Sequence, residues 1–388
     1  MIAPAALEWR KAPYKLTKVI HDVETAKDRQ MDLDDLNTMA QLDSGQMVAR
    51  IRELPDQCRA AWNQAQSLNL PDSLGDVDNI VIVGMGGSAI GGALLQDLTA
   101  GQCPVPVTVV RGYSLPAFVG GARTLVIACS YSGNTEETLS CVRHAVERES
   151  QVLAITTGGR LAELAREGTP KLVRFSYQSQ PRAALGYSFV LLVGALHRLA
   201  LIPDYSAQVT EAAAVMEAWQ GEIQIRVPTS ENAAKQLAQK VHGGLPVVYG
   251  AGFLTATANR WKTQFNENAK NWAAYETLPE LNHNAVVGLG IPEVAREHIL
   301  VVALRSALDS VRIAERWDVT AQLLDREGVS AEQVWGRGEG KLAQILSLIH
   351  FGDYVSYYTA MLNQVDPTPV ETIAFLKDRL AQLGSIAE

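Results

Sequence analysis

The sequence lacks several patterns that would place it in a specialised class of proteins. Its 388 residues include four cysteines, Cys58, Cys103, Cys129 and Cys141, with neither a C-x-x-C pair nor zinc-type spacing. We interpret them as reduced, mostly buried thiols of a cytosolic protein. The N-terminus shows no signal-peptide pattern, and no run approaches the roughly 18 apolar residues of a membrane span. We therefore expect a cytoplasmic protein without a membrane partner.

Positive charge is also scarce. Lys and Arg number 34 against 42 Asp and Glu, so the net charge is −8. Sequence-independent binding of nucleic acid needs a basic face, and we therefore expect no nucleic-acid partner. The histidines form no metal-like cluster and no H-E-x-x-H motif occurs, so the sequence predicts no metal and no other cofactor. The chain does contain 47% hydrophobic residues, which is enough to bury a large core.

The order of apolar runs along the chain predicts the fold class. Short β-branched or apolar runs alternate with helix-like segments from residue 79 and again from residue 245. This alternation is typical of parallel sheets that are covered by helices on both faces. The chain is also longer than a single core usually is, so we expect an α/β protein with two similar domains. The predicted boundaries are an N-terminal helical extension over 1–76, a first domain over 77–205, a helical linker over 206–230, and a second domain with a C-terminal helical segment over 231–388.

A glycine-rich segment, Gly84-Met85-Gly86-Gly87-Ser88-Ala89, lies between the first predicted strand and a helix. Backbone N–H groups at such a junction bind anions. The segment also fits the dinucleotide pattern G-x-G-x-x-A, which needs an acidic residue at the end of the next strand. That strand ends in Val110-Arg111 instead, so a small phosphate is favoured, with an NADP-dependent oxidoreductase as an alternative. A tight turn without a binding role is the other interpretation.

A second junction is rich in hydroxyl groups. Ser130-Tyr131-Ser132-Gly133-Asn134-Thr135 supplies three hydroxyls within six residues. Hydroxyls and helix N–H groups together suit a dianionic phosphate without a lysine. A simple N-cap by Ser132 or Thr135 is the alternative interpretation. We predict that phosphate is bound by Gly87, Ser88, Ser130, Ser132 and Thr135.

Together these two segments resemble the sugar isomerase (SIS) domain family. Four further segments resemble its bifunctional phosphoglucose/phosphomannose isomerase branch: Gln180-Pro181-Arg182, Phe265-Asn266-Glu267-Asn268-Ala269-Lys270, Glu280-Leu281-Asn282-His283-Asn284, and Val365-Asp366-Pro367-Thr368-Pro369-Val370. The resemblance covers roughly residue 31 to the end. It implies two SIS domains with doubly wound, flavodoxin-like sheets, and a homodimer with active sites at the subunit interface. The implied reaction interconverts glucose 6-phosphate, and mannose 6-phosphate, with fructose 6-phosphate through a cis-enediolate and without a metal.

The resemblance also implies a role for each candidate site residue. Glu267 would be the base that shuttles the proton, and Arg182 would bind the substrate and stabilise the enediolate. His283, expected from the partner subunit, and Lys377 would assist ring opening. Thr368 is the candidate for the residue that lets the site accept both C2 epimers, glucose 6-phosphate and mannose 6-phosphate. Without the resemblance, we would interpret Glu267 as a solvated surface residue and Arg182 as part of a structural ion pair. His283 would be a loop histidine without a role, and Lys377 a surface lysine.

Glu267 falls in the segment 256–274, whose pattern predicts a helix. Trp261 and Phe265 on that helix would supply apolar neighbours, and a partly dry cleft would raise the basicity of the carboxylate.

Two other functions are alternatives to catalysis by this family. A non-catalytic phosphosugar-binding SIS regulator would keep the serine loop, but it would not need Glu267, Arg182 and His283 together. Such a regulator usually carries a basic helix-turn-helix, for which the sequence has no candidate. An amide-transferring aminosugar phosphate synthase would need a glutaminase domain, which this sequence does not contain.

Overall fold

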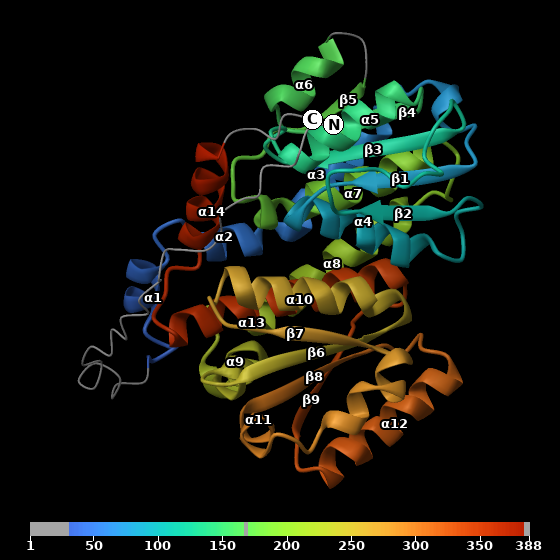
Figure 1. Cartoon of the computed structure of the whole chain (residues 1–388). Coiled ribbons are helices and arrows are strands. Elements are labelled where there is room, and N and C mark those ends of the chain that lie inside the picture. The colour runs from blue at the N-terminus through green and yellow to red at the C-terminus, as the bar shows by residue number, and fades with distance from the viewer. Residues whose placement is uncertain (1–30, 167–169, 384–388) are drawn as a thin grey trace, which may run out of the picture. The chain divides into compact units, whose positions relative to one another are not determined.

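The computed structural model describes residues 31–166 and 170–383 (Figure 1). Residues 1–30, to which we assign no chemistry, lie outside the described part of the chain. The remainder of the expected N-terminal extension begins with three helices, α1 (Leu36–Leu42), α2 (Met47–Arg52) and α3 (Leu54–Gln66). Asp35 begins α1, because its side chain accepts hydrogen bonds from two backbone N–H groups of the first turn.

The first sheet contains five parallel strands in the order β2-β1-β3-β4-β5. Their bounds are β1 (Asn79–Val83), β2 (Val107–Val110), β3 (Thr124–Ser130), β4 (Gln151–Thr156) and β5 (Lys171–Arg174). This is the flavodoxin-like order, in which the chain reverses its direction of winding between β1 and β3. Ligands of such sheets bind at the carboxyl ends of these two strands.

The second sheet repeats this order with four parallel strands, β7-β6-β8-β9. Their bounds are β6 (Leu245–Ala251), β7 (Ala274–Leu278), β8 (Ile299–Arg305) and β9 (Ser330–Trp335). The predicted fold class, an α/β chain with two doubly wound parallel sheets, is confirmed. The edge strand β2 was predicted from the run Val105 to Val110, whereas the edge strands β5, β7 and β9 were not predicted, because they carry no long apolar run.

Helices cover both faces of each sheet. Those of the first half are α4 (Gly86–Thr99), α5 (Glu136–Glu147), α6 (Gly159–Arg166) and α7 (Leu185–Arg198). Helix α8 (Ser206–Ile223) connects them to the second half. There the helices are α9 (Ala233–Val241), α10 (Thr255–Glu267), α11 (Glu293–His298), α12 (Val311–Arg326), α13 (Lys341–Leu362) and α14 (Glu371–Gln382). Figure 1 shows α10 and α13 on one side of the second sheet and α12 on the other.

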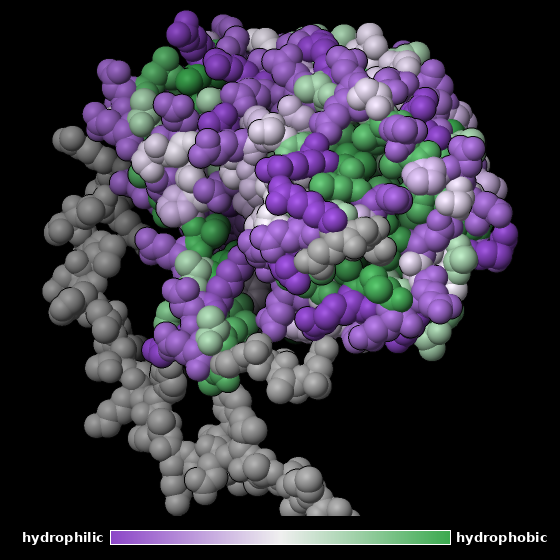
Figure 2. All heavy atoms as spheres, turned by 90° about the horizontal axis from the view of Figure 1, so that it is seen from above, coloured by the Kyte–Doolittle hydropathy of each residue, from purple (hydrophilic) through white to green (hydrophobic). Residues whose placement is uncertain are grey.

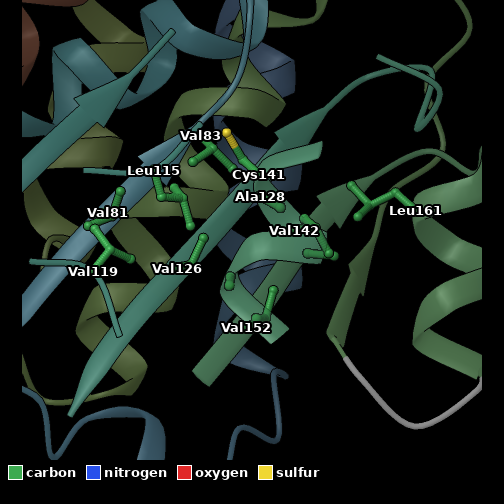
Figure 3. Packing of buried hydrophobic residues seen from close by; sticks show 12 residues of the cluster. Val81, Val83, Leu115, Val119, Val126, Ala128, Cys141, Val142, Val152 and Leu161 are labelled. Atoms are coloured by element: carbon green, nitrogen blue, oxygen red, sulfur yellow. The ribbon is translucent and has the colours of Figure 1, made fainter. Parts of the chain in front are cut away.

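The face of the first sheet that is turned toward α5 and α6 buries one hydrophobic cluster (Figure 3). Alternate residues of β1 and β3, such as Val81 and Val126, point into it because side chains of a strand alternate between its faces. Cys141 of α5 is a buried member of this cluster. Cys58 and Cys129 are also buried and unbonded, whereas Cys103 is half-buried, which agrees with the interpretation of mostly buried thiols.

Helix α13 forms the centre of the second half. All of its residues after Lys341 are buried, because α8, α9 and α10 pack around it. Trp261 of α10 lies directly against Gly352, where any side chain would overlap the indole ring. A helix that is apolar on all sides is suited to such a position. Among the described residues, no helix is long and apolar enough to cross a membrane.

The structure departs from two local expectations. Helix α3, expected to belong to an extension, packs against α7 and α8, so it is part of the layer beneath the first sheet. Helix α10 ends at Glu267, seven residues before the expected end at Ala274. It ends there because Asn268 caps it and Lys270 takes a left-handed conformation with φ of 52°. Glu267 is therefore the last residue of a helix and not part of its middle.

Seen from above, the surface is predominantly hydrophilic, and apolar side chains reach it in some places (Figure 2). Exposed apolar side chains are frequent on α14, which buries none of its residues. They are Ile373, Phe375, Leu376 and Leu380.

One carboxylate links the two halves at the N-terminus of α10. Asp97 of α4 accepts a hydrogen bond from the Ala256 backbone N–H at 2.6 Å. Burial raises the pKa of Asp97 to about 6. The native carboxyl therefore holds its proton to a higher pH than the unfolded one, so the free energy of unfolding falls as pH rises from about 4 to 6.

The substitution Asp97→Asn is expected to stabilise the protein above pH 7. The amide oxygen can keep the bond to Ala256 while the cost of burying a charge disappears, a gain of about 1–2 kcal/mol in the free energy of unfolding. Thermal denaturation at pH 8 and pH 5 measures it, and the gain should shrink at pH 5. The exposed control Asp325→Asn should show no such pH dependence. An equal effect of Asp97→Asn at both pH values would contradict the role of burial.

Candidate active site

The candidate site begins where the two predicted phosphate loops meet. The loop after β1 and the loop after β3 lie at the reversal point of the first sheet. The Tyr131 backbone N–H donates to Ser88 Oγ at 3.2 Å and so joins them. Ser88 and Ser130 are both buried, and with Pro181 they line a small hollow between the loops. The structure therefore brings the predicted loop residues together.

The hydroxyls of the second loop face one another. Ser130 Oγ lies 2.9 Å from Thr135 Oγ1 and also accepts from the Gly133 N–H at 3.1 Å. Ser132 Oγ is exposed and accepts from the Asn134 N–H at 3.2 Å. Gly133 has φ of 70°, and a Cβ there would overlap the Gly158 carbonyl, so the loop requires glycine.

Both helices that follow these loops begin without a side-chain cap. Thr135 occupies the N-cap position of α5 but makes no capping hydrogen bond, and Met85 precedes α4 likewise. The structure thus bears out the N-cap position of Thr135 but not a capping hydrogen bond, because its hydroxyl bonds with Ser130. The first backbone N–H groups of two adjacent helices, supported by their dipoles, form a cradle suited to a phosphate.

Arg182 lies directly beside the first loop. It belongs to the short 3-10 helix η2 (Pro181–Ala184) that leads into α7. A Cβ on Gly87 would come within 3.2 Å of the backbone of Arg182, so only glycine lets the two segments approach this closely. The guanidinium is buried, with 2% of the side chain exposed.

The Arg182 side chain joins three segments that are distant in sequence. Its Nε donates to Asn268 Oδ1 at 2.7 Å, and its Nη2 donates to the carbonyls of Pro367 and Thr368 at 2.6 and 2.8 Å. Its Nη1 lies 3.4 Å from Glu267 Oε2. Burial lowers the pKa of Arg182, and Glu267 partly opposes this effect. A fixed cation thus stands beside a carboxylate that remains 27% exposed.

A second buried pair supports Arg182 from below and was not found from the sequence. Arg260 Nη2 donates to the Arg182 carbonyl at 2.9 Å and pairs with Asp353 at 2.9 Å. Both side chains are almost completely buried. The sequence carries little signal for this pair: Asp353 is a carboxylate within the apolar stretch of α13, whereas Arg260 lies among other polar residues of α10.

Thr368 contributes its backbone. Its carbonyl accepts from Arg182, while its side chain packs against Gly45 in the turn between α1 and α2. The Thr368 hydroxyl is buried and has no partner among the described residues.

The structure does not bring His283 to this site within one chain. His283 ends the 3-10 helix η5 (Glu280–His283), in which Asn282 hydrogen-bonds to Thr320 and Arg316 of α12. Helix α12 covers the face of the second sheet that is opposite to α10 (Figure 1). The sheet therefore lies between His283 and Glu267.

Lys377 lies on α14, and its side chain is exposed. Helix α14 follows Thr368 closely, but within the described part of the chain Lys377 makes no polar contact with Arg182 or Glu267.

The second sheet repeats the junction without its binding groups. Ser130 follows Ala128 by two residues, and Arg305 holds the same place after Ala303 of β8. Arg305 is buried and stacks over Trp335 with its guanidinium carbon 4.6 Å from the ring centre. The N-terminus of α10, which corresponds to that of α4, is taken by Asp97. Among the described residues, the second half therefore does not repeat the serine and the uncapped helix N-terminus of the predicted phosphate cradle.

No group of three or more His, Cys, Asp or Glu side chains that could hold a metal ion occurs among the described residues. The prediction of a metal-free site is not tested by this observation.

The chain is similar to several known proteins. Residues 230–380 match the family model described as the bacterial phospho-glucose isomerase C-terminal SIS domain. A bifunctional phosphoglucose/phosphomannose isomerase of Caldicellulosiruptor bescii is 40% identical over 87% of this chain and 99% of its own length. A bifunctional phosphoglucose/phosphomannose isomerase of Thermoplasma acidophilum is 36% identical over 79% of this chain and 91% of its own length. The structure of tagatose-6-phosphate ketose/aldose isomerase from Escherichia coli shares the fold, with a TM-score of 0.65 and 16% identity over 84% of this chain and 96% of that one.

Removing the Arg182 guanidinium is expected to destabilise the protein. Arg182→Met leaves Asn268 Oδ1 and two buried carbonyls without a donor, at a cost of about 3 kcal/mol. Arg182→Lys keeps the charge but not the fork of donors, so its loss should be about half as large. Urea denaturation measures both, with the exposed Arg312→Met as control. Equal stability of Arg182→Met and Arg312→Met would show that the guanidinium does not hold the segments together.

Proposed function

This chain belongs to the bifunctional phosphoglucose/phosphomannose isomerase family, and from that premise we propose that it interconverts glucose 6-phosphate and mannose 6-phosphate with fructose 6-phosphate. The observation that carries the proposal is the pair of Arg182 and Glu267, whose side chains lie 3.4 Å apart. Through η2 this pair is connected to the N-termini of α4 and α5, which have no side-chain cap and are suited to a phosphate. An anion cradle, a base and a fixed cation are what this reaction requires.

In the proposed mechanism the sugar phosphate binds at the N-termini of α4 and α5. Gly87, Ser88, Ser130, Ser132 and Thr135 supply backbone N–H groups and hydroxyls to the phosphate oxygens. This places the other end of the open-chain sugar toward the end of α10. No lysine is needed for the phosphate, because helix dipoles and hydroxyls provide the positive potential.

Glu267 then acts as the proton shuttle. Its carboxylate removes the proton from C2 of the aldose, and the C1 carbonyl oxygen takes up the charge, so that a cis-enediolate forms. The hydroxyl proton then passes from O2 to O1, and the same carboxyl returns its proton to C1 as C2 becomes the carbonyl carbon of the ketose. Arg182 faces Glu267 and stabilises the negative charge that develops on the enediolate oxygens. Because Arg182 is held by three other acceptors, it needs little rearrangement when the charge appears.

Ring opening requires a further acid–base group, and the geometry within one chain does not supply it. We assign this role to His283 of the partner subunit in a homodimer. The second sheet separates His283 from Glu267 of its own chain. Apolar side chains near His283 are unusually exposed, namely Val287 at 85%, Ile291 at 86% and Val294 at 62%. A partner subunit would cover them, because exposed apolar patches of this kind mark interfaces.

Lys377 is proposed to assist the same step. It lies two to three turns along α14 from the Thr368 carbonyl that Arg182 holds. The apolar residues of α14, such as Phe375 with 60% exposure, would also be covered in a dimer.

A coupled assay tests the function directly. Purified protein treated with EDTA is given fructose 6-phosphate, and the formation of glucose 6-phosphate and of mannose 6-phosphate is followed separately. We expect both products, because the proposed proton transfer uses side chains alone. Binding of sugar phosphates without turnover would instead favour the phosphosugar-binding regulator, and activity that is lost with EDTA would contradict the metal-free mechanism.

Mixed dimers test the origin of the histidine. Glu267→Gln and His283→Asn should each lower kcat at least a thousandfold while sugar phosphate binding persists, since the cradle is untouched. If His283 acts on the partner's site, co-refolding the two variants creates one complete site in each mixed dimer and restores about a quarter of the wild-type activity. If His283 acts within its own chain, every site in the mixed dimer lacks one group and no activity returns. A Glu276→Gln variant serves as the matched, active control.

A further inference from the structure

The turn after α10 contains Lys270, whose ammonium group contacts the end of α10 and the Pro367 segment beside the candidate site. Lys270 has a left-handed backbone with φ of 52°, which a non-glycine residue adopts only at a cost. In this conformation its Nζ donates to the Glu267 carbonyl at 2.6 Å and to the Pro367 carbonyl at 3.2 Å. One bond closes the C-terminal end of α10, and the other reaches the segment that precedes α14.

The Pro367 carbonyl is shared with Arg182. Arg182 Nη2 donates to this oxygen at 2.6 Å, so two cations converge on one acceptor. Glu267 is thus held from two sides: its carboxylate faces Arg182, and its carbonyl is held by Lys270. The distance between base and cation depends on both contacts.

The turn itself is otherwise fixed without Lys270. Asn268 Nδ2 donates to Ser356 Oγ at 3.0 Å, and Asn363 Nδ2 donates to the Ala269 carbonyl at 2.9 Å. Asn266 Nδ2 donates to the Asn271 carbonyl at 2.9 Å. Two of these amides hold backbone carbonyls of the turn, and the amide of Asn268 joins the turn to α13, so the turn has other contacts that fix it besides those of Lys270.

The charges around Lys270 act in opposite directions. Burial, and after it the charge of Arg182, lowers the pKa of Lys270 to about 8, although Asp366 and Glu267 oppose this shift. The amine therefore loses its proton in a pH range in which the enzyme can be assayed. A neutral amine donates weaker hydrogen bonds than an ammonium, because the charge-assisted part of the interaction disappears.

We propose that Lys270 is a positioning residue of the isomerase reaction, which holds Glu267 and the Pro367 segment against Arg182 while its amine is protonated. This inference rests on the proposed function. It predicts that Lys270 acts on kcat and not on KM, since the phosphate cradle lies on the other side of Arg182. It also predicts that the rate falls as Lys270 deprotonates.

The test compares Lys270→Met and Lys270→Arg with the wild type from pH 6.5 to 9.5. For the wild type, kcat should fall about tenfold between pH 7 and pH 9, as one group with a pKa of about 8 loses its proton. Lys270→Arg should keep most of kcat at pH 7 and hold it at pH 9, because a guanidinium stays charged. Lys270→Met should lower kcat about ten- to a hundredfold at pH 7, with little change in KM.

The matched control is Lys262→Met, on the helix α10 that precedes the turn of Lys270, which should follow the wild type at every pH. A Lys270→Arg variant whose rate falls with pH as the wild type's does would overturn the proposal, and this comparison remains valid even if Lys270→Met does not fold. The proposal would also be overturned if Lys270→Met had the kcat of the wild type and a lowered melting temperature, because a purely structural role of Lys270 gives that result. A wild type without isomerase activity would overturn the proposed function and the inference with it, whereas an active wild type isolates the role of Lys270.

Discussion

The buried guanidinium of Arg182 is the interaction on which the site depends. It takes acceptors from the end of α10 and from the segment before α14, while its own backbone lies against the Gly87 loop. Three stretches of chain that are far apart in sequence therefore meet around one charge. Because a buried charge without partners is very unfavourable, these segments hold one another in place. The Arg260–Asp353 pair extends the same network to α13.

The duplication of the fold is not a duplication of the site. Both sheets follow the same strand order, and both place a glycine turn and a second loop at the reversal point. In the first half these junctions offer hydroxyls and uncapped helices. In the second half Arg305 replaces the serine, and Asp97 occupies the helix N-terminus. In the proposed site the first half would therefore provide the phosphate cradle and the cation, and the second half would provide the carboxylate at the end of α10.

Helix ends carry most of the proposed chemistry. The N-termini of α4 and α5 form the cradle, and Glu267 is the last residue of α10. A residue at a helix end can be held by backbone contacts of the following turn, as Lys270 holds the Glu267 carbonyl, while its side chain remains partly exposed to a substrate. A carboxylate in the middle of α10 would have faced either the core or the solvent.

The sequence by itself determined the fold class and the candidates. Apolar runs identified β1, β3, β4, β6 and β8, and the glycine and serine junctions marked the cradle, because strand burial and sharp turns restrict which residues are used. It could not show that α10 stops at Glu267, that Arg182 faces Glu267, or that Arg260 and Asp353 lie beneath them. It also could not show that a sheet separates His283 from the base. The contacts among these side chains join residues 78 to 93 positions apart. The end of α10 depends on contacts of the following turn with α13 and with Pro367, and the place of His283 depends on which face of the sheet its neighbours cover. Only the tertiary packing decides these relations.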